Sequence, residues 1–205
     1  MKSKRGFTLI ELLAVIVILG VLLSIAIPKV SQYINNSKKE GFVSNSKIFI
    51  DSVRKDATSE MFSLPIRNND VTIVTLDSVS VDNAKQKSSF GGKYIYNKSY
   101  VAIINVGTGV DPDYRYYLAV QDSKDYAIPL TLEKEITIDK IVAKAKNKME
   151  VTIQSLCGTK DGYKKSYSTI SGLDSVQPVD ENGNKISWNA TIFSEEECNS
   201  NEDIQ

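Results

Sequence analysis

The chain has 205 residues, enough for one membrane-spanning segment and one folded domain. Its 25 basic and 25 acidic residues cancel, so we expect no strong electrostatic field for nucleic acid. The absence of histidine removes the commonest general base and a frequent metal ligand, and with them an ordinary serine–histidine–aspartate site. We expect neither a metal nor a cofactor. The expectation that the protein is not an enzyme rests on the amino-terminal segment rather than on composition.

A basic leader, MKSKRG at residues 1–6, precedes a long apolar segment. In residues 7–27 the only polar side chains are those of Thr8, Glu11 and Ser24. A helix of this length, at about 1.5 Å per residue, spans roughly 30 Å, the thickness of a bilayer's hydrocarbon core. The basic leader should stay in the cytoplasm, which places the carboxyl-terminal part outside the membrane.

Three interpretations of this segment stay open from its composition. A cleaved secretory signal would use the small-residue triplet Ser24-Ile25-Ala26, but the apolar run is long for a signal and contains Glu11. Pro28, just after that cut, is also unfavourable. A plain uncleaved anchor, such as one that carries a surface binding domain, explains the length and gives Glu11 no purpose. A third interpretation uses every residue.

The stretch KRGFTLIE at residues 4–11, followed by the apolar run, resembles the processing motif of type IV prepilins and pseudopilins. The resemblance implies that a dedicated membrane peptidase cuts between Gly6 and Phe7 and then methylates the new amino terminus of Phe7. It also implies partners: this peptidase, other pilin subunits, and an inner-membrane assembly machinery. The Lys-, Asn- and Ile-rich composition is typical of such proteins from Gram-positive bacteria.

Glu11 is the residue that a membrane segment should least tolerate. A carboxylate in hydrocarbon costs about 2.5 kcal/mol or more and needs a partner. Cleavage after Gly6 would create a cation, the amine of Phe7, about 6 Å away along a helix axis. Parallel subunits staggered by that length would pair the acid of one with the amine of the next. We therefore expect Glu11 to serve assembly, although it could also reach back to the amine of its own chain.

Two further residues of the segment affect its helix. Pro28 lacks an N–H group, so the carbonyl of Ser24 loses its helical partner, and Gly20 adds local freedom. Filaments of the family often have a loosened helix between such positions. A simple kink where the helix leaves the bilayer is an equally good interpretation.

The remaining sequence predicts an α+β fold of the pilin kind. We expect residues 7–28 to be the transmembrane and assembly half of one helix, and 29–60 its amphipathic half, with Phe42, Phe49 and Val53 on one stripe. Residues 61–156 should form an antiparallel sheet domain, with a short helix near 138–148. The expected strands are 71–76, a hairpin of 94–97 with 100–106, a half-buried strand at 114–121, and 150–154.

Residues 157–205 form a turn-rich region with the only two cysteines, Cys157 and Cys198. In an exported chain a disulfide between them is expected, and closing about forty residues contributes roughly 4 kcal/mol on the chain-entropy model. Many pilins carry such a bridge, whereas those of low-GC Gram-positive bacteria often lack it. Two unpaired thiols are the alternative.

Two polar features are expected to be ordinary surface. The stretch Asp180–Asn184 has its glycine at the fourth position rather than the sixth, so a turn is favoured over a calcium loop. The lysines between 140 and 148 fit a solvated face better than a nucleic-acid contact.

Together these features predict a structural subunit, a major or minor pilin, that is first a single-pass membrane protein and then part of a surface filament. The sequence leaves open a pseudopilin of a secretion or DNA-uptake machine.

Overall fold

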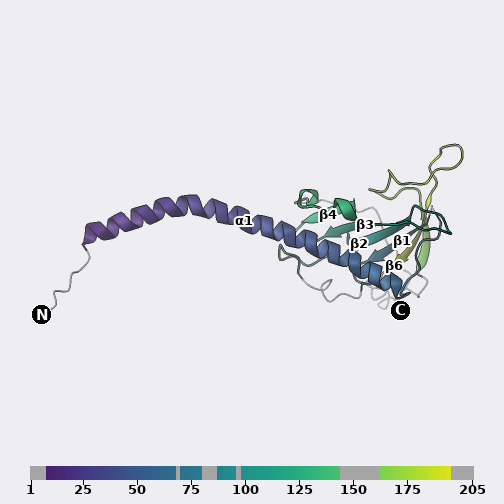
Figure 1. Ribbon diagram of the computed structural model, residues 1–205, viewed down its shortest axis with the longest axis horizontal. Helices are drawn as coiled ribbons and strands as arrows, with labels where there is room; N and C mark the ends of the chain where they lie inside the picture. The colour runs from purple at the N-terminus through teal and green to yellow at the C-terminus, as the bar shows by residue number, and fades with distance from the viewer. Residues whose placement is uncertain (1–7, 68–69, 80–86, 96–97, 144–161, 195–205) are drawn as a thin grey trace, which may run out of the picture. The chain divides into compact units, whose positions relative to one another are not determined.

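The computed structural model describes residues 8–67, 70–79, 87–95, 98–143 and 162–194. In these ranges the chain forms one long helix, α1 (Leu9–Thr58), and a six-stranded sheet (Figure 1). The chain divides into two compact units, residues 1–38 and 39–205, and α1 contributes to both. The predicted α+β class with a long N-terminal helix is confirmed.

The sheet has the strand order β4-β3-β2-β1-β6-β5. Its strands are β1 (Asp70–Thr75), β2 (Tyr100–Asn105), β3 (Tyr114–Gln121), β4 (Ala127–Leu132), β5 (Tyr163–Tyr167) and β6 (Trp188–Phe193). Neighbouring strands are antiparallel except β1 and β6, which are parallel, so the sheet is mixed rather than purely antiparallel as expected. Parallel neighbours need a long crossover connection, and no local turn signal in the sequence reveals such a pair.

The second half of α1 packs on one face of this sheet. Its buried positions recur every three or four residues, as one helical stripe requires: Phe42, Ser46, Phe49, Ile50, Val53, Asp56 and Ala57. They meet the apolar side chains that β2, β3 and β4 direct to the same face, among them Ile103 and Leu118. Gly41 lies close to Ser89, whose hydroxyl oxygen would be 3.1 Å from an added Cβ. The glycine thus allows a close approach to the loop before β2.

One ion pair joins α1 to the short 3-10 turn η3 (Glu133–Glu135) that follows β4. Arg54 donates to both carboxylate oxygens of Glu133, at 2.7 and 2.9 Å, and its guanidinium lies 4.7 Å from the ring centre of Tyr116. Because the pair is partly exposed, it contributes little free energy. Both of its hydrogen bonds come from Nη2 of Arg54, and with the Tyr116 contact they orient the helix over β3.

The helix ends at Thr58 through backbone hydrogen bonds and not through a proline. The N–H of Met61 donates to the carbonyl of Asp56, and the N–H of Glu60 donates to that of Ala57. Glu60 adopts a φ of 56° in the left-handed region. These two bonds define a Schellman motif, here with glutamate where glycine is usual.

The other face of the sheet is also covered. From Tyr116 onward every residue of β3 is buried, so the predicted half-buried strand is in fact enclosed on both faces. Ile170, Leu173 and Trp188 belong to a second apolar cluster with side chains of β1, β2 and β3. The region expected to be merely turn-rich therefore supplies two strands and the cover of this face, braced by Gln177, whose amide donates to two carbonyls at 2.8 and 2.9 Å.

The predicted hairpin between residues 94–97 and 100–106 is wrong for the residues described. Tyr94 bridges Asp122 next to β3, and the N–H of Ile95 donates to the carbonyl of Gln121. The ring of Tyr94 packs edge-on against Phe49, with centroids 5.1 Å apart, so a tertiary contact decides where this segment pairs.

The predicted short helix near 138–148 is also wrong as far as residue 143. Ile138–Lys140 forms a 3-10 turn, η4, and Val142 then bridges Ala127 at the start of β4. The backbone of this edge strand needs partners, and Val142 supplies them. Residues 144–148, like the strand expected at 150–154, lie outside the described residues.

Candidate assembly site and membrane-spanning helix

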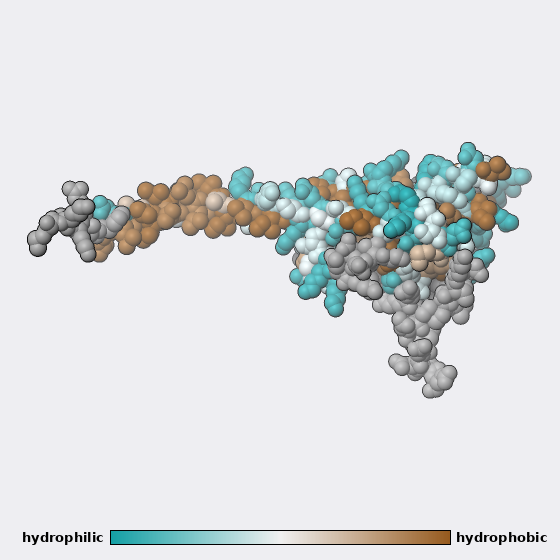
Figure 2. Space-filling view, turned by 60° about the horizontal axis from the view of Figure 1, so that its bottom comes forward, coloured by the Kyte–Doolittle hydropathy of each residue, from teal (hydrophilic) through white to brown (hydrophobic). Residues whose placement is uncertain are grey.

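The first half of α1 exposes an unbroken apolar surface. Every large apolar side chain from Leu9 to Ile34 is at least 45% exposed, and an 18-residue window reaches a mean hydropathy of 2.9 with none of it buried. Figure 2 shows these side chains as a continuous brown surface along the helix. By length and composition this helix can cross a membrane, as a signal sequence near an amino terminus also can. In water such a surface would be unfavourable, so it must lie in lipid or against other helices.

Thr8 and Glu11 form a capping box at the start of this helix. The backbone N–H and the hydroxyl of Thr8 both donate to Oε2 of Glu11 at 2.8 Å. In return, the N–H of Glu11 donates to the hydroxyl of Thr8 at 3.3 Å. This reciprocal pattern satisfies backbone donors that a helix start leaves without partners. Glu11 thus reaches back to Thr8 of its own chain. Its pairing with an amine of Phe7, in the same chain or in a neighbour, stays a prediction, because Phe7 lies outside the described residues.

The capping role of Thr8 was not predicted, although its signal is present in the sequence. A threonine followed three residues later by glutamate, before an apolar run, is the known signature of this motif. The cap matters because an acid inside hydrocarbon needs partners, and Thr8 supplies two donors from within the same turn. The cap accounts for one carboxylate oxygen of Glu11.

The other predicted site residues are placed as follows. Gly20 and Pro28 both lie inside α1, which continues as an α-helix through them, and nothing lies within 4 Å of a Cβ added at Gly20. The loosening of the helix expected from the family resemblance therefore stays a prediction for the assembled state. Gly6, Phe7, Cys157 and Cys198 lie outside the described residues.

The turn at Asp180 has a local explanation. One carboxylate oxygen of Asp180 accepts the N–H groups of Asn182 and Asn184, and the other accepts the side-chain amide of Asn184 at 3.0 Å. These hydrogen bonds hold the pKa of Asp180 below its usual value, the side-chain bond from Asn184 contributing most. The aspartate closes a surface turn with its own loop, as the sequence predicted.

Comparison with known proteins identifies the amino-terminal signal. Residues 1–27 match the family model described as the prokaryotic N-terminal methylation motif. This motif is the signal of type IV prepilins and pseudopilins. No curated protein and no solved structure matches the chain. The match ends at residue 27, so it says nothing of the sheet domain.

These findings define a class of protein. The motif and the long apolar helix support a type IV pilin-like or pseudopilin protein that is anchored in a membrane. The motif indicates a structural subunit rather than an enzyme. It implies processing by a prepilin peptidase and assembly with other pilins.

Proposed function

We propose that the protein is a subunit of a type IV pilus-like surface filament. It is cut between Gly6 and Phe7, methylated on Phe7, and assembled through the first half of α1, with the carboxyl-terminal domain outside the membrane. The observation that carries the proposal is the methylation motif directly before an exposed apolar helix with a single acid. A pseudopilin of a secretion or DNA-uptake machine would use the same helix and is the second candidate function.

Deletion distinguishes these two uses. A pilus subunit predicts surface filaments that are lost when the gene is removed. A pseudopilin predicts lost secretion or transformation in cells that never show such filaments. The sheet domain, which builds an apolar core on each face of its sheet, favours a subunit that displays a stable outer domain.

We further propose that Glu11 has two roles: its negative charge pairs with an amine during assembly, and its side-chain oxygen accepts the hydrogen bonds of the cap. After cleavage the amine of Phe7 would lie about one helical turn from Glu11, in its own chain or in the next subunit. Capping needs an acceptor on residue 11, which glutamine also provides, whereas ion pairing needs the negative charge. Two substitutions therefore separate the roles.

Glu11→Gln should abolish incorporation into filaments while the protein still inserts into the membrane, because the cap remains and the charge is lost. Thr8→Val, the matched control, removes the hydroxyl of the cap and keeps the charge, so it should reduce incorporation only a few-fold. Sheared filament fractions and membrane fractions, compared by immunoblot, measure both. Normal incorporation of Glu11→Gln, or a stronger defect in Thr8→Val, would contradict the charge-pairing role.

We also propose that Cys157 and Cys198 form a disulfide. The β5–β6 ladder pairs Tyr163 with Ile192, and each cysteine lies six residues beyond one of these two residues. Two segments of equal length that leave paired residues can bring their ends together without a register mismatch. The bridge would hold the start of β5 and the end of β6 at one edge of the sheet.

Intact mass before and after alkylation of the purified protein tests this bridge. We expect no free thiol until a reductant is added. Cys157→Ser and Cys198→Ser should each lower the free energy of unfolding by the same amount, about 2–5 kcal/mol. Two alkylated thiols in the unreduced protein, recovered from the cell surface, would contradict the bridge.

A further inference from the structure

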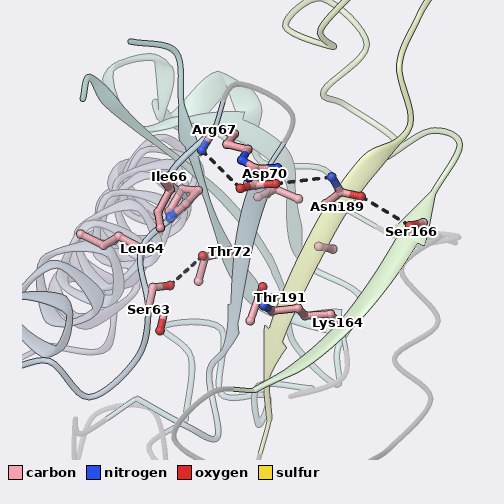
Figure 3. Close-up of a pocket in the computed structure, with 13 residues that line it drawn as sticks. Ser63, Leu64, Ile66, Arg67, Asp70, Thr72, Lys164, Ser166, Asn189 and Thr191 are labelled. Carbon is pink, nitrogen blue, oxygen red and sulfur yellow. Dashed lines mark hydrogen bonds between the residues drawn. The ribbon is translucent and has the colours of Figure 1, made fainter. Parts of the chain in front are cut away.

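A groove of about 710 Å³ lies between the segment that follows α1 and the strands β1, β6 and β5 (Figure 3). Its wall is the segment 63–67. Its floor consists of two rows of polar side chains that follow the strand register, Asp70 with Asn189 and Ser166, and Thr72 with Thr191 and Lys164. The same sheet face is apolar further across, where α1 covers it. The polar floor is therefore a local feature of β1, β6 and β5.

Most of the polar groups in the groove already have partners. Asp70 accepts the N–H of Arg67 at 3.2 Å and the side-chain amide of Asn189 at 3.4 Å. Thr72 donates to the carbonyl of Ser63 at 2.9 Å, and Ser166 donates to Asn189 at 3.5 Å. The one carboxylate of the groove is thus engaged within the protein.

The two cations of the groove are not engaged in this way. Among the residues that the structure describes, no carboxylate lies within 4 Å of the charged nitrogens of Arg67 or Lys164. Lys164 is exposed, next to the hydroxyl of Thr191. A groove with two unpaired cations and several hydroxyl and amide groups suits an acidic, extended peptide.

The chain itself contains such a peptide. Residues 195–205, EEECNSNEDIQ, carry five acidic and no basic side chains. The chain leaves β6 beside the groove, because Phe193 packs on Phe62 with ring centroids 5.4 Å apart, directly before Ser63 begins the wall. Lys164 pairs with Thr191, two residues before Phe193, which is about 7 Å along the strand.

We propose that the groove binds the acidic segment 195–205 of the same chain, with its first glutamates near Lys164. Each exposed ion pair alone would strengthen binding only a few-fold. The covalent link to β6 supplies the remaining binding strength, because a short tether raises the local concentration of the segment to the millimolar range. This contact would cover the polar face of β1, β6 and β5, and salt would weaken it. It is independent of the proposed filament function.

Zero-length carbodiimide cross-linking of the full chain in detergent micelles tests the contact. The reagent condenses a lysine amine with a carboxylate, with loss of water, only where the two already touch. We expect amide links from Lys164 to glutamates of 195–205, and at least about tenfold fewer from Lys124, an equally exposed lysine in the β3–β4 turn. In 1 M NaCl the Lys164 links should fall several-fold.

An equal mixture of ¹⁵N-labelled and unlabelled chains distinguishes the possible occupants. Links within one isotope form only are expected. Mixed-isotope links would show that the groove takes the segment of a second copy, and this would overturn the proposal. Equal links from Lys164 and Lys124, or none, would overturn it as well.

A second readout uses Arg67→Gln combined with Lys164→Gln. These exposed positions lie outside the two apolar clusters, so the fold should remain intact. Cleavage of the segment by a glutamate-specific protease should be faster than in the unmodified chain, by up to about tenfold at low salt. Equal rates would show that the segment was never bound.

Discussion

The two units of the chain use apolar residues in opposite ways. In residues 9–34 the large apolar side chains are all exposed, and they are arranged around the whole circumference of the helix. After residue 39 the same helix keeps its apolar residues on one stripe, and that stripe is buried. One continuous helix thus changes its solvent: the first part is suited to lipid or to other helices, and the second to its own sheet.

Burial in the single chain therefore does not show which apolar side chains the protein needs for its function. A side chain such as Ile50 stabilises the folded domain, whereas one such as Ile18 contributes nothing to it until the protein meets a membrane or a neighbour. The same substitution should therefore lower the stability of the folded domain in the second region and leave it unchanged in the first.

The largest expected effect comes from such a matched pair of substitutions. Ile50→Ala leaves a cavity in the core and should lower the free energy of unfolding by about 2–5 kcal/mol. Ile18→Ala removes the same atoms from a side chain that is 59% exposed and should leave that free energy unchanged. Urea unfolding in detergent, followed by the fluorescence of the single tryptophan, buried Trp188, measures both. Equal losses in the two variants would contradict the division between the regions.

A smaller effect concerns alkaline pH and is confined to the second region. Burial of the Tyr94 hydroxyl raises its pKa to about 12, from a usual value near 10. The folded state therefore holds this proton more tightly than the unfolded state. The resulting stability is present in full below pH 10 and is lost as the pH rises toward 12, by about 2–3 kcal/mol.

Unfolding midpoints between pH 9 and 12 measure this loss. In Tyr94→Phe the loss should be shallower but not absent, because burial also raises the pKa of Tyr100. A pH profile identical in the two proteins would show that Tyr94 ionises without unfolding the domain.

The smallest effect lies at the end of α1. Glu60 adopts a left-handed conformation, which costs a residue with a Cβ more than it costs glycine. Glu60→Gly should therefore raise the free energy of unfolding by about 0.5–1 kcal/mol, with Glu60→Asn giving part of that gain. Because Pro65 plays no part in this motif, Pro65→Ala should not reproduce the gain. A loss of stability in Glu60→Gly would mean that its side chain makes a compensating contact.

The sequence predicted those elements whose signal is local. The stripe of Phe42, Phe49 and Val53 follows from helical spacing, and β3 was placed correctly by its alternation. The pairing of β1 with β6 was not predictable, since 118 residues and the strands β2 to β5 lie between Val71 and its partner Ala190, and no neighbouring turn marks the pair. Tyr94 was assigned to the wrong pair, because its segment bridges Asp122 and its ring packs on Phe49, contacts that no local pattern shows.

At the candidate site, too, the residues close together in the sequence were predicted and those far apart were not. Gly6, Phe7 and Glu11 were predicted from a motif of consecutive residues, and their individual roles stay predictions, while residues 1–27 as a whole match the methylation motif. The capping box was overlooked because the acid had already been given another role. The groove over β1, β6 and β5 could not be foreseen, since its floor combines residues from three distant parts of the sequence.

The mass of the amino-terminal peptide of the protein recovered from cells tests the central claim most directly. We predict a peptide that begins at Phe7 and carries one methyl group on its amine. A peptide beginning at Ile27 would mean a secreted soluble domain, and an intact Met1 would mean a plain anchor. Either of these would contradict the filament subunit proposed here.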